Sequence, residues 1–69
     1  MHEAIEIKLN GESKRIKSST LSALLSELEL AQKKVAIELN KNIVPKNAYE
    51  NTKLSFGDQV EIIHFVGGG

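Results

Sequence analysis

The sequence contains no cysteine and no tryptophan, and it has only one tyrosine and two phenylalanines. Without cysteine the chain has no disulfide, no thiol nucleophile and no thiolate metal site. The two histidines, His2 and His64, are distant from each other along the chain, so we expect no metal site. An enzyme of this size would need a metal or a disulfide framework. These absences argue against a catalytic function and leave aliphatic side chains to build the core.

Charge and hydropathy argue against two further classes of function. Nine basic and nine acidic side chains cancel, whereas a nucleic-acid binder usually carries a basic excess. No apolar stretch approaches the length of a membrane span, and the first residues show no signal-peptide pattern. We therefore expect a soluble, cytoplasmic protein with no nucleic-acid partner and no membrane partner.

A chain of 69 residues has room for one small domain. We expect residues 1–66 to form that domain and residues 67–69 to form a flexible C-terminal glycine tail. Alternation of apolar and polar side chains predicts strands over residues 4–9, 12–16, 35–40, 43–44 and 59–66.

Turn and helix signals separate these strands. Asn10-Gly11 is the signature of a type I′ hairpin turn. Thr20 is the expected N-cap of a helix that ends near residue 29 or 30. One face of this helix carries an apolar stripe of Leu21, Leu24, Leu25 and Leu28. The principal elements read ββαββ, which predicts an α+β fold with one mixed sheet packed on one helix.

The chain ends in an apolar strand followed directly by Gly67, Gly68 and Gly69. Glycine contributes no side chain to packing and loses the most backbone entropy when it is ordered. We therefore infer that another molecule uses the tail and that the Gly69 carboxylate is the reactive group. Gly67 and Gly68, which lack Cβ atoms, suit a tail that threads a narrow channel in a partner.

The last strand becomes apolar on both faces as it approaches the tail, although only one face of the sheet has a helix to cover it. Ile63 and Phe65 share the uncovered face and predict an exposed apolar patch. The predicted partner interface consists of Ile63, His64, Phe65 and Val66.

The order of elements and the glycine tail resemble the ubiquitin-like β-grasp fold, and the whole chain resembles the ThiS family of sulfur carriers. The stretches that carry the resemblance are Leu9-Asn10-Gly11, Thr20 to Leu25, Val35 to Asn40, Ile43-Val44-Pro45, Gly57-Asp58 and Val60 to Gly69. The resemblance implies a carrier for the thiazole ring of thiamin, and not an enzyme.

The resemblance also implies the partners. A ThiF-like adenylating enzyme would use ATP and Mg²⁺ to convert the Gly69 carboxylate to an acyl-adenylate. Sulfur from a persulfide on a donor protein would displace AMP and leave a thiocarboxylate at Gly69. A ThiG-like thiazole synthase would take up that sulfur. The chain itself would bind no cofactor.

Three alternatives remain open from the residues. The small subunit of molybdopterin synthase uses the same kind of tail for the molybdenum cofactor. A ubiquitin-like modifier would be joined to lysines through Gly69. A plain interaction module would make the glycines incidental.

Overall fold

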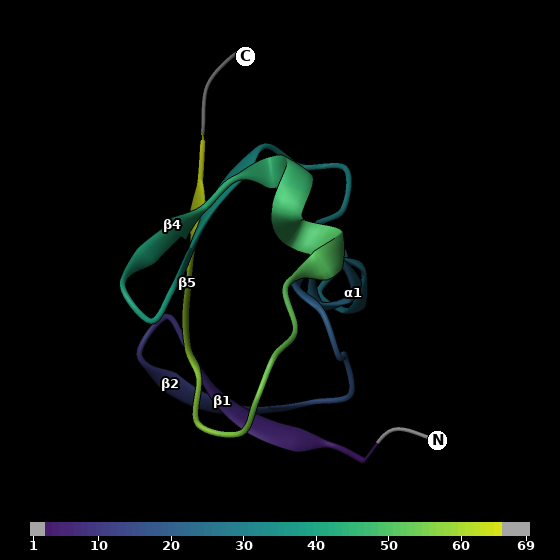
Figure 1. Ribbon diagram of the computed structural model, residues 1–69, viewed down its shortest axis with the longest axis vertical. Coiled ribbons are helices and arrows are strands. Elements are labelled where there is room, and N and C mark those ends of the chain that lie inside the picture. The colour runs from purple at the N-terminus through teal and green to yellow at the C-terminus, as the bar shows by residue number, and fades with distance from the viewer. Residues whose placement is uncertain (1–2, 66–69) are drawn as a thin grey trace.

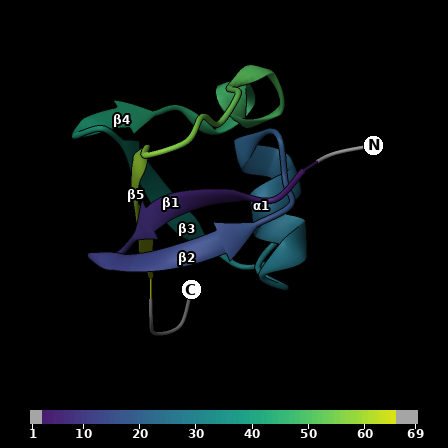
Figure 2. The same ribbon diagram turned by 90° about the horizontal axis from the view of Figure 1, so that it is seen from below.

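The computed structural model describes residues 3–65, which form one sheet and one α-helix that packs on its inner face (Figures 1 and 2). The strands and helices follow the chain in the order β1 (Ile5–Leu9), β2 (Glu12–Ile16), α1 (Leu21–Glu27), β3 (Val35–Leu39), β4 (Asn42–Val44), the 3₁₀ helix η1 (Lys46–Asn51) and β5 (Gln59–His64). The predicted α+β architecture, with one mixed sheet and one helix, is confirmed.

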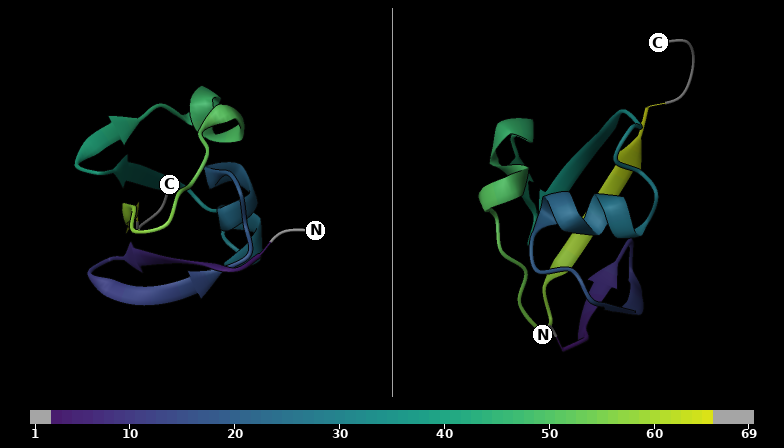
Figure 3. Two further views of the ribbon diagram at one scale, coloured as in Figure 1. Left: turned by 60° about the horizontal axis from the view of Figure 1, so that its bottom comes forward. Right: turned by 90° about the vertical axis from the view of Figure 1, so that its right-hand side faces the viewer.

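The five strands lie in the order β2-β1-β5-β3-β4. β5 runs parallel to β1 and antiparallel to β3, and both outer pairs are antiparallel. The last strand of the chain therefore occupies the centre of the sheet, as the yellow strand between the two hairpins in Figure 3 shows. The short strand predicted at residues 43–44 is confirmed as the edge strand β4, which pairs with β3, so the sheet has one strand more than the ββαββ notation counts.

The core lies between the inner face of the sheet and α1. The residues in it that are fully buried are aliphatic: Ile7, Ile16, Leu21, Leu24, Ile37 and Val60. Leu25 is also buried, while Leu28, the last residue of the predicted stripe, packs at the border of the core. Burial of a side chain of this size contributes about 1.5–3 kcal/mol, so the leucine stripe accounts for the packing of α1.

The start of α1 follows the sequence signal, and its end does not. The Thr20 hydroxyl accepts a hydrogen bond from the Ala23 N–H at 3.1 Å, as an N-cap does. The helix ends at Glu27, short of the predicted end at residue 29 or 30. Glu29 takes a left-handed conformation (φ 62°), and the Leu30 N–H donates back to the Leu25 carbonyl at 2.7 Å. Glycine usually marks such a helix end, and none is present here.

Two asparagines, one at each hairpin turn, attach β5 to its neighbours. Asn10 follows β1 and Asn40 follows β3, both at positive φ (50° and 51°). The Asn10 N–H donates to the Val60 carbonyl at 2.8 Å, and its side-chain oxygen accepts from the Ile62 N–H at 2.8 Å. The Asn40 N–H donates to the Gln59 carbonyl at 2.7 Å. The Asn40 side-chain oxygen accepts a hydrogen bond from the Gln59 N–H at 2.9 Å. The central strand is therefore anchored from both sides.

The second of these turns differs from the sequence prediction. The predicted strands at residues 35–40 and 43–44 imply a turn at residues 41–42, whereas the structure turns at Asn40 and Lys41, both at positive φ, and Asn42 begins β4. Asparagine tolerates this conformation better than most residues. The predicted turn at Asn10-Gly11 is confirmed, with φ of 50° and 85°.

Glu27, the last residue of α1, connects the helix to the segment that follows β2. Its carboxylate accepts hydrogen bonds from the Lys17 N–H at 3.1 Å and from the Ser18 hydroxyl. The Ser18 hydrogen bond is the main cause that lowers the pKa of Glu27 below its ordinary value of 4.5. A lowered pKa means that the ionised carboxylate is favoured in the folded state.

We expect Glu27→Gln to lower the free energy of unfolding by at most about 1 kcal/mol at neutral pH, because the carboxylate is exposed. The contribution is present above the unfolded pKa and is lost as pH falls through the lowered folded pKa. Urea unfolding of both proteins at pH 7 and pH 3 checks this. The effects of Ser18→Ala and Glu27→Gln on the free energy of unfolding should not be additive. Equal destabilisation by Glu27→Gln at both pH values would contradict the interpretation.

We expect Asn10→Gly to lower the free energy of unfolding by about 1–3 kcal/mol. Glycine keeps the positive φ but leaves the Ile62 N–H without its acceptor. Lys41→Gly is the matched control, since Lys41 also has positive φ (73°) and an exposed side chain. Denaturant midpoints should fall for Asn10→Gly and should not fall for Lys41→Gly. Equal midpoints for both variants would show that the side-chain bond to β5 is unimportant.

Candidate functional site

The candidate site is the end of β5, where the chain leaves the sheet. β5 ends at His64, and the Phe65 N–H then donates to the Lys34 carbonyl at 3.1 Å, which continues the pairing with the segment before β3. The last fixed point before the tail is therefore Phe65. Val66, Gly67, Gly68 and Gly69 lie outside the described residues, so their predicted roles, and the predicted flexibility of residues 67–69, stay predictions.

The side chains at this end of β5 are exposed. Ile63 is 47% exposed and Phe65 is 62% exposed, whereas their neighbour Ile62 is 6% exposed and belongs to the core. The alternation predicted by the sequence is thus confirmed through Ile63 and is broken at His64, which is also exposed. The exposure of Ile63 and Phe65 follows the prediction of an apolar patch near the tail.

The arrangement of these two side chains differs from the prediction that they share one strand face. Ile63 lies opposite Ala36 in the β3–β5 pair, on the outer face of the sheet. The strand ends at His64, so its alternation does not extend to Phe65. Phe65 instead lines a groove whose other walls come from α1, η1 and residues 31–35. The apolar surface at the base of the tail therefore faces two directions.

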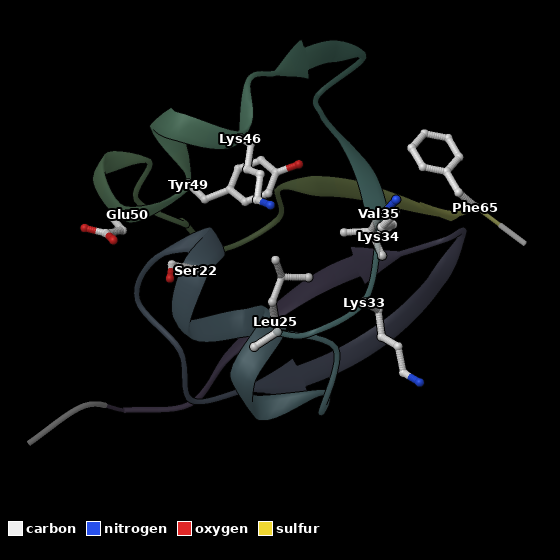
Figure 4. A pocket seen from close by; sticks show the side chains of 10 residues that line it. Ser22, Leu25, Lys33, Lys34, Val35, Lys46, Tyr49, Glu50 and Phe65 are labelled. Carbon is white, nitrogen blue, oxygen red and sulfur yellow. The ribbon is translucent and has the colours of Figure 1, made fainter. Parts of the chain in front are cut away.

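The groove beside Phe65 has a volume of about 420 Å³ and lies between α1, η1 and the start of β3. Figure 4 shows Leu25 reaching up from α1, Tyr49 and Lys46 coming from η1, and Val35 with Phe65 on the opposite side. We call it the tail-base groove. No sequence pattern indicated it, because its walls come from segments far apart in the chain.

The tail-base groove combines an apolar floor with basic groups. Leu25 and Tyr49 are each 7% exposed and form part of the floor. Three lysines (Lys33, Lys34 and Lys46) line it, against one carboxylate, Glu50. A cleft with an excess of one charge attracts ligands of the opposite charge. The groove is thus suited to an apolar side chain with acidic neighbours.

Two other large apolar side chains are exposed, and the sequence did not single them out. Ile43 on β4 is 76% exposed, and Phe56, in the turn that precedes β5, is 78% exposed. Phe56 lies before the first residue of β5, at the opposite end of that strand from the tail. Single exposed apolar residues are common on protein surfaces, so neither defines a site by itself.

The described part of the chain shows no arrangement of residues that would hold a metal. Among residues 3–65, no group of three or more His, Cys, Asp and Glu side chains comes together. Within the same residues, none of the helices has the length and apolar character needed to cross a membrane.

Comparison with known proteins identifies the family. The family model described as "ThiS family" matches residues 7–69. The chain is 40% identical over 65 residues to the sulfur carrier protein ThiS of Bacillus subtilis, an alignment that covers 91% of this chain and 98% of that protein. It is also 42% identical over 66 residues to a thiazole synthase of Paramagnetospirillum magneticum. There the alignment covers 94% of this chain, which spans only 20% of the length of that relative.

A solved structure supports the same assignment. The crystal structure of the thiamine biosynthesis protein ThiS from Geobacter metallireducens superposes with a TM-score of 0.80 at 32% identity. The match covers 94% of this chain and all of that one. The β-grasp fold expected from the sequence resemblance is therefore confirmed, and on the family model, the Bacillus relative and this structure together, the chain belongs to the ThiS family.

Proposed function

We propose that this chain carries sulfur to the thiazole ring of thiamin as a thiocarboxylate on Gly69. The observation that carries the proposal is the family match, which extends to residue 69 and so includes the glycine tail. The full-length similarity to a sulfur carrier protein supports it. The position of β5 supports it as well, because the strand that leads to the tail is anchored on both sides and ends in exposed side chains.

The chemistry requires partners that activate the carboxylate. In an adenylating enzyme of the ThiF type, which uses ATP and Mg²⁺, a Gly69 carboxylate oxygen attacks the α-phosphorus and pyrophosphate leaves. The terminal sulfur of a donor protein's persulfide then attacks the acyl carbon, and AMP leaves. A second thiol attacks the donor cysteine's sulfur and releases the thiocarboxylate, with a disulfide as the other product. This chain contributes the acyl carbon and holds no cofactor.

The tail sequence suits this role. Gly69 presents a carbonyl carbon with no side chain beside it, and Gly67 and Gly68 can adopt backbone angles closed to other residues. In the proposed reaction sequence the chain acts in the cytoplasm as a substrate of its partners and is not itself an enzyme. Catalytic groups belong to those partners.

The thiazole branch is favoured over molybdopterin synthesis and over protein modification, two of the alternatives considered from the sequence. Proteins named thiazole synthase contain a segment 42% identical to this chain, and a segment of this kind within the same polypeptide supports a functional association with a ThiG-like enzyme. Rescue of a thiamin auxotroph, and not of a molybdenum-cofactor auxotroph, is the expected genetic result.

Incubation with the adenylating enzyme, MgATP and a persulfide donor should raise the intact mass of the chain by the difference between one sulfur and one oxygen. Fragmentation should localise the change to Gly69. A chain that lacks Gly69 should gain nothing and should keep the melting temperature of the parent, because glycine has no side chain to contribute to core packing. An unchanged mass of the full chain with active partners would refute the carrier function.

We expect Phe65→Ala to weaken binding to the thiazole synthase partner about tenfold, as truncation of an exposed aromatic contact residue does. Phe56→Ala is the matched control, because Phe56 is also exposed and lies at the other end of β5. Both variants should keep their melting temperatures. Calorimetry would contradict the interface if the two variants bound equally well.

A further inference from the structure

The two long sides of β5 are paired to different extents. On the β3 side, pairing extends through His64 opposite Val35 and continues to the Phe65–Lys34 hydrogen bond. On the β1 side, the last pair joins Leu9 and Val60. The final part of β5 therefore has a neighbour on one side only.

The hydrogen-bond pattern shows which backbone groups face the unpaired side. Gln59 and Phe65 bond toward β3, so odd-numbered residues of β5 face β3 and even-numbered residues face β1. The Val60 carbonyl and the Ile62 N–H are satisfied by Asn10. The next groups on that side are the Ile62 carbonyl and the His64 N–H and carbonyl. No partner among residues 3–65 bonds them, and we call these three groups the β5 edge.

The β5 edge is open because the first hairpin is short. β1 stops at Leu9, and the chain reverses at Asn10-Gly11 while β5 continues toward the C-terminus (Figure 1). At Gly11 in this turn, an added Cβ would meet no atom within 4 Å. An added strand would thus lie beyond the turn, along the line that β1 leaves vacant.

The two outer strands of the sheet carry features that discourage pairing with another strand. The β5 edge lacks these features. β2 presents Lys14 and Arg15, and β4 is three residues long and is followed by Pro45. Charge, short length and proline are common means of protecting an edge strand. The β5 edge is flanked instead by the exposed side chains of Ile63 and Phe65. An unprotected edge beside exposed apolar groups is suited to a partner strand.

We propose that an extended segment of the thiazole synthase partner pairs with the β5 edge and adds a strand to the sheet beside the tail. This inference rests on the proposed function, because it assigns the contact to the enzyme that receives the tail. Main-chain hydrogen bonds to Ile62 and His64 fix the position of the strand along its axis. These hydrogen bonds thereby set how far Gly69 extends into the active site of the partner. Phe65 contributes a side-chain contact with the partner next to them.

The test removes one edge N–H without changing any side chain. The full 69-residue chain is made by chemical synthesis with N-methyl-His64, which deletes the donor and places a methyl group on the open edge. N-methyl-Arg15 is the matched control. The β1–β2 register, with Leu9 opposite Glu12 as a bonded pair, directs the Arg15 N–H outward from β2, a different edge.

Both synthetic variants should unfold at the same denaturant concentration as the unmodified synthetic chain. Binding to the purified thiazole synthase should weaken at least tenfold for N-methyl-His64 and stay unchanged for N-methyl-Arg15. In the unmodified chain, hydrogen exchange of the His64 amide should slow on binding. Destabilisation specific to N-methyl-His64, or binding within twofold of the parent, would overturn the proposal.

The failure of this inference is distinguishable from failure of the carrier function. If the unmodified chain gains sulfur at Gly69 but N-methyl-His64 binds normally, the docking mode is wrong and the carrier function stands. If the unmodified chain gains no sulfur with active partners, the carrier function is wrong whatever the binding result.

Discussion

The central position of β5 is the constraint on which the rest of this structure depends. A last strand between β1 and β3 is bonded on both sides, and the side-chain oxygens of Asn10 and Asn40 fix it where regular pairing ends. The glycines follow closely on this strand in the sequence. The strand that precedes them is therefore paired with a neighbour on each side.

The base of the tail offers different surfaces on its different sides. The tail-base groove lies on the side of α1 and η1, lined by apolar side chains and three lysines. The β5 edge lies on the β1 side and presents main-chain groups. Ile63 is exposed on the outer face. A partner that contacts Phe65, the groove and the edge together would restrain both the direction and the depth of the glycines. That arrangement suits the proposed function, in which the partners supply the catalytic groups.

Sequence patterns predicted most of the elements, for identifiable reasons. The leucine stripe of α1 and the Thr20 cap are local signals with a fixed period and a fixed position, and both are present in the structure. Asn10-Gly11 predicted its turn because a type I′ turn requires positive φ at both central positions, which asparagine and glycine tolerate. The end of α1 was missed because Glu29, and not glycine, takes the left-handed position. The turn at Asn40 and Lys41 was misplaced for a similar reason, as lysine rarely signals positive φ.

The sequence by itself determined the period of each element and the apolar face of each strand, and it is the source of the proposal for the glycine terminus. These depend on side-chain type and spacing along the chain. Tertiary structure alone decided the strand order, the tail-base groove and the open edge of β5. It also decided that Asn10 and Asn40 both form turns and bond β5. Each of these brings together residues far apart in sequence, such as Asn10 with Ile62 or Leu25 with Phe65. Periodicity reports which face of a segment is buried, but it carries no information about which segment lies beside it.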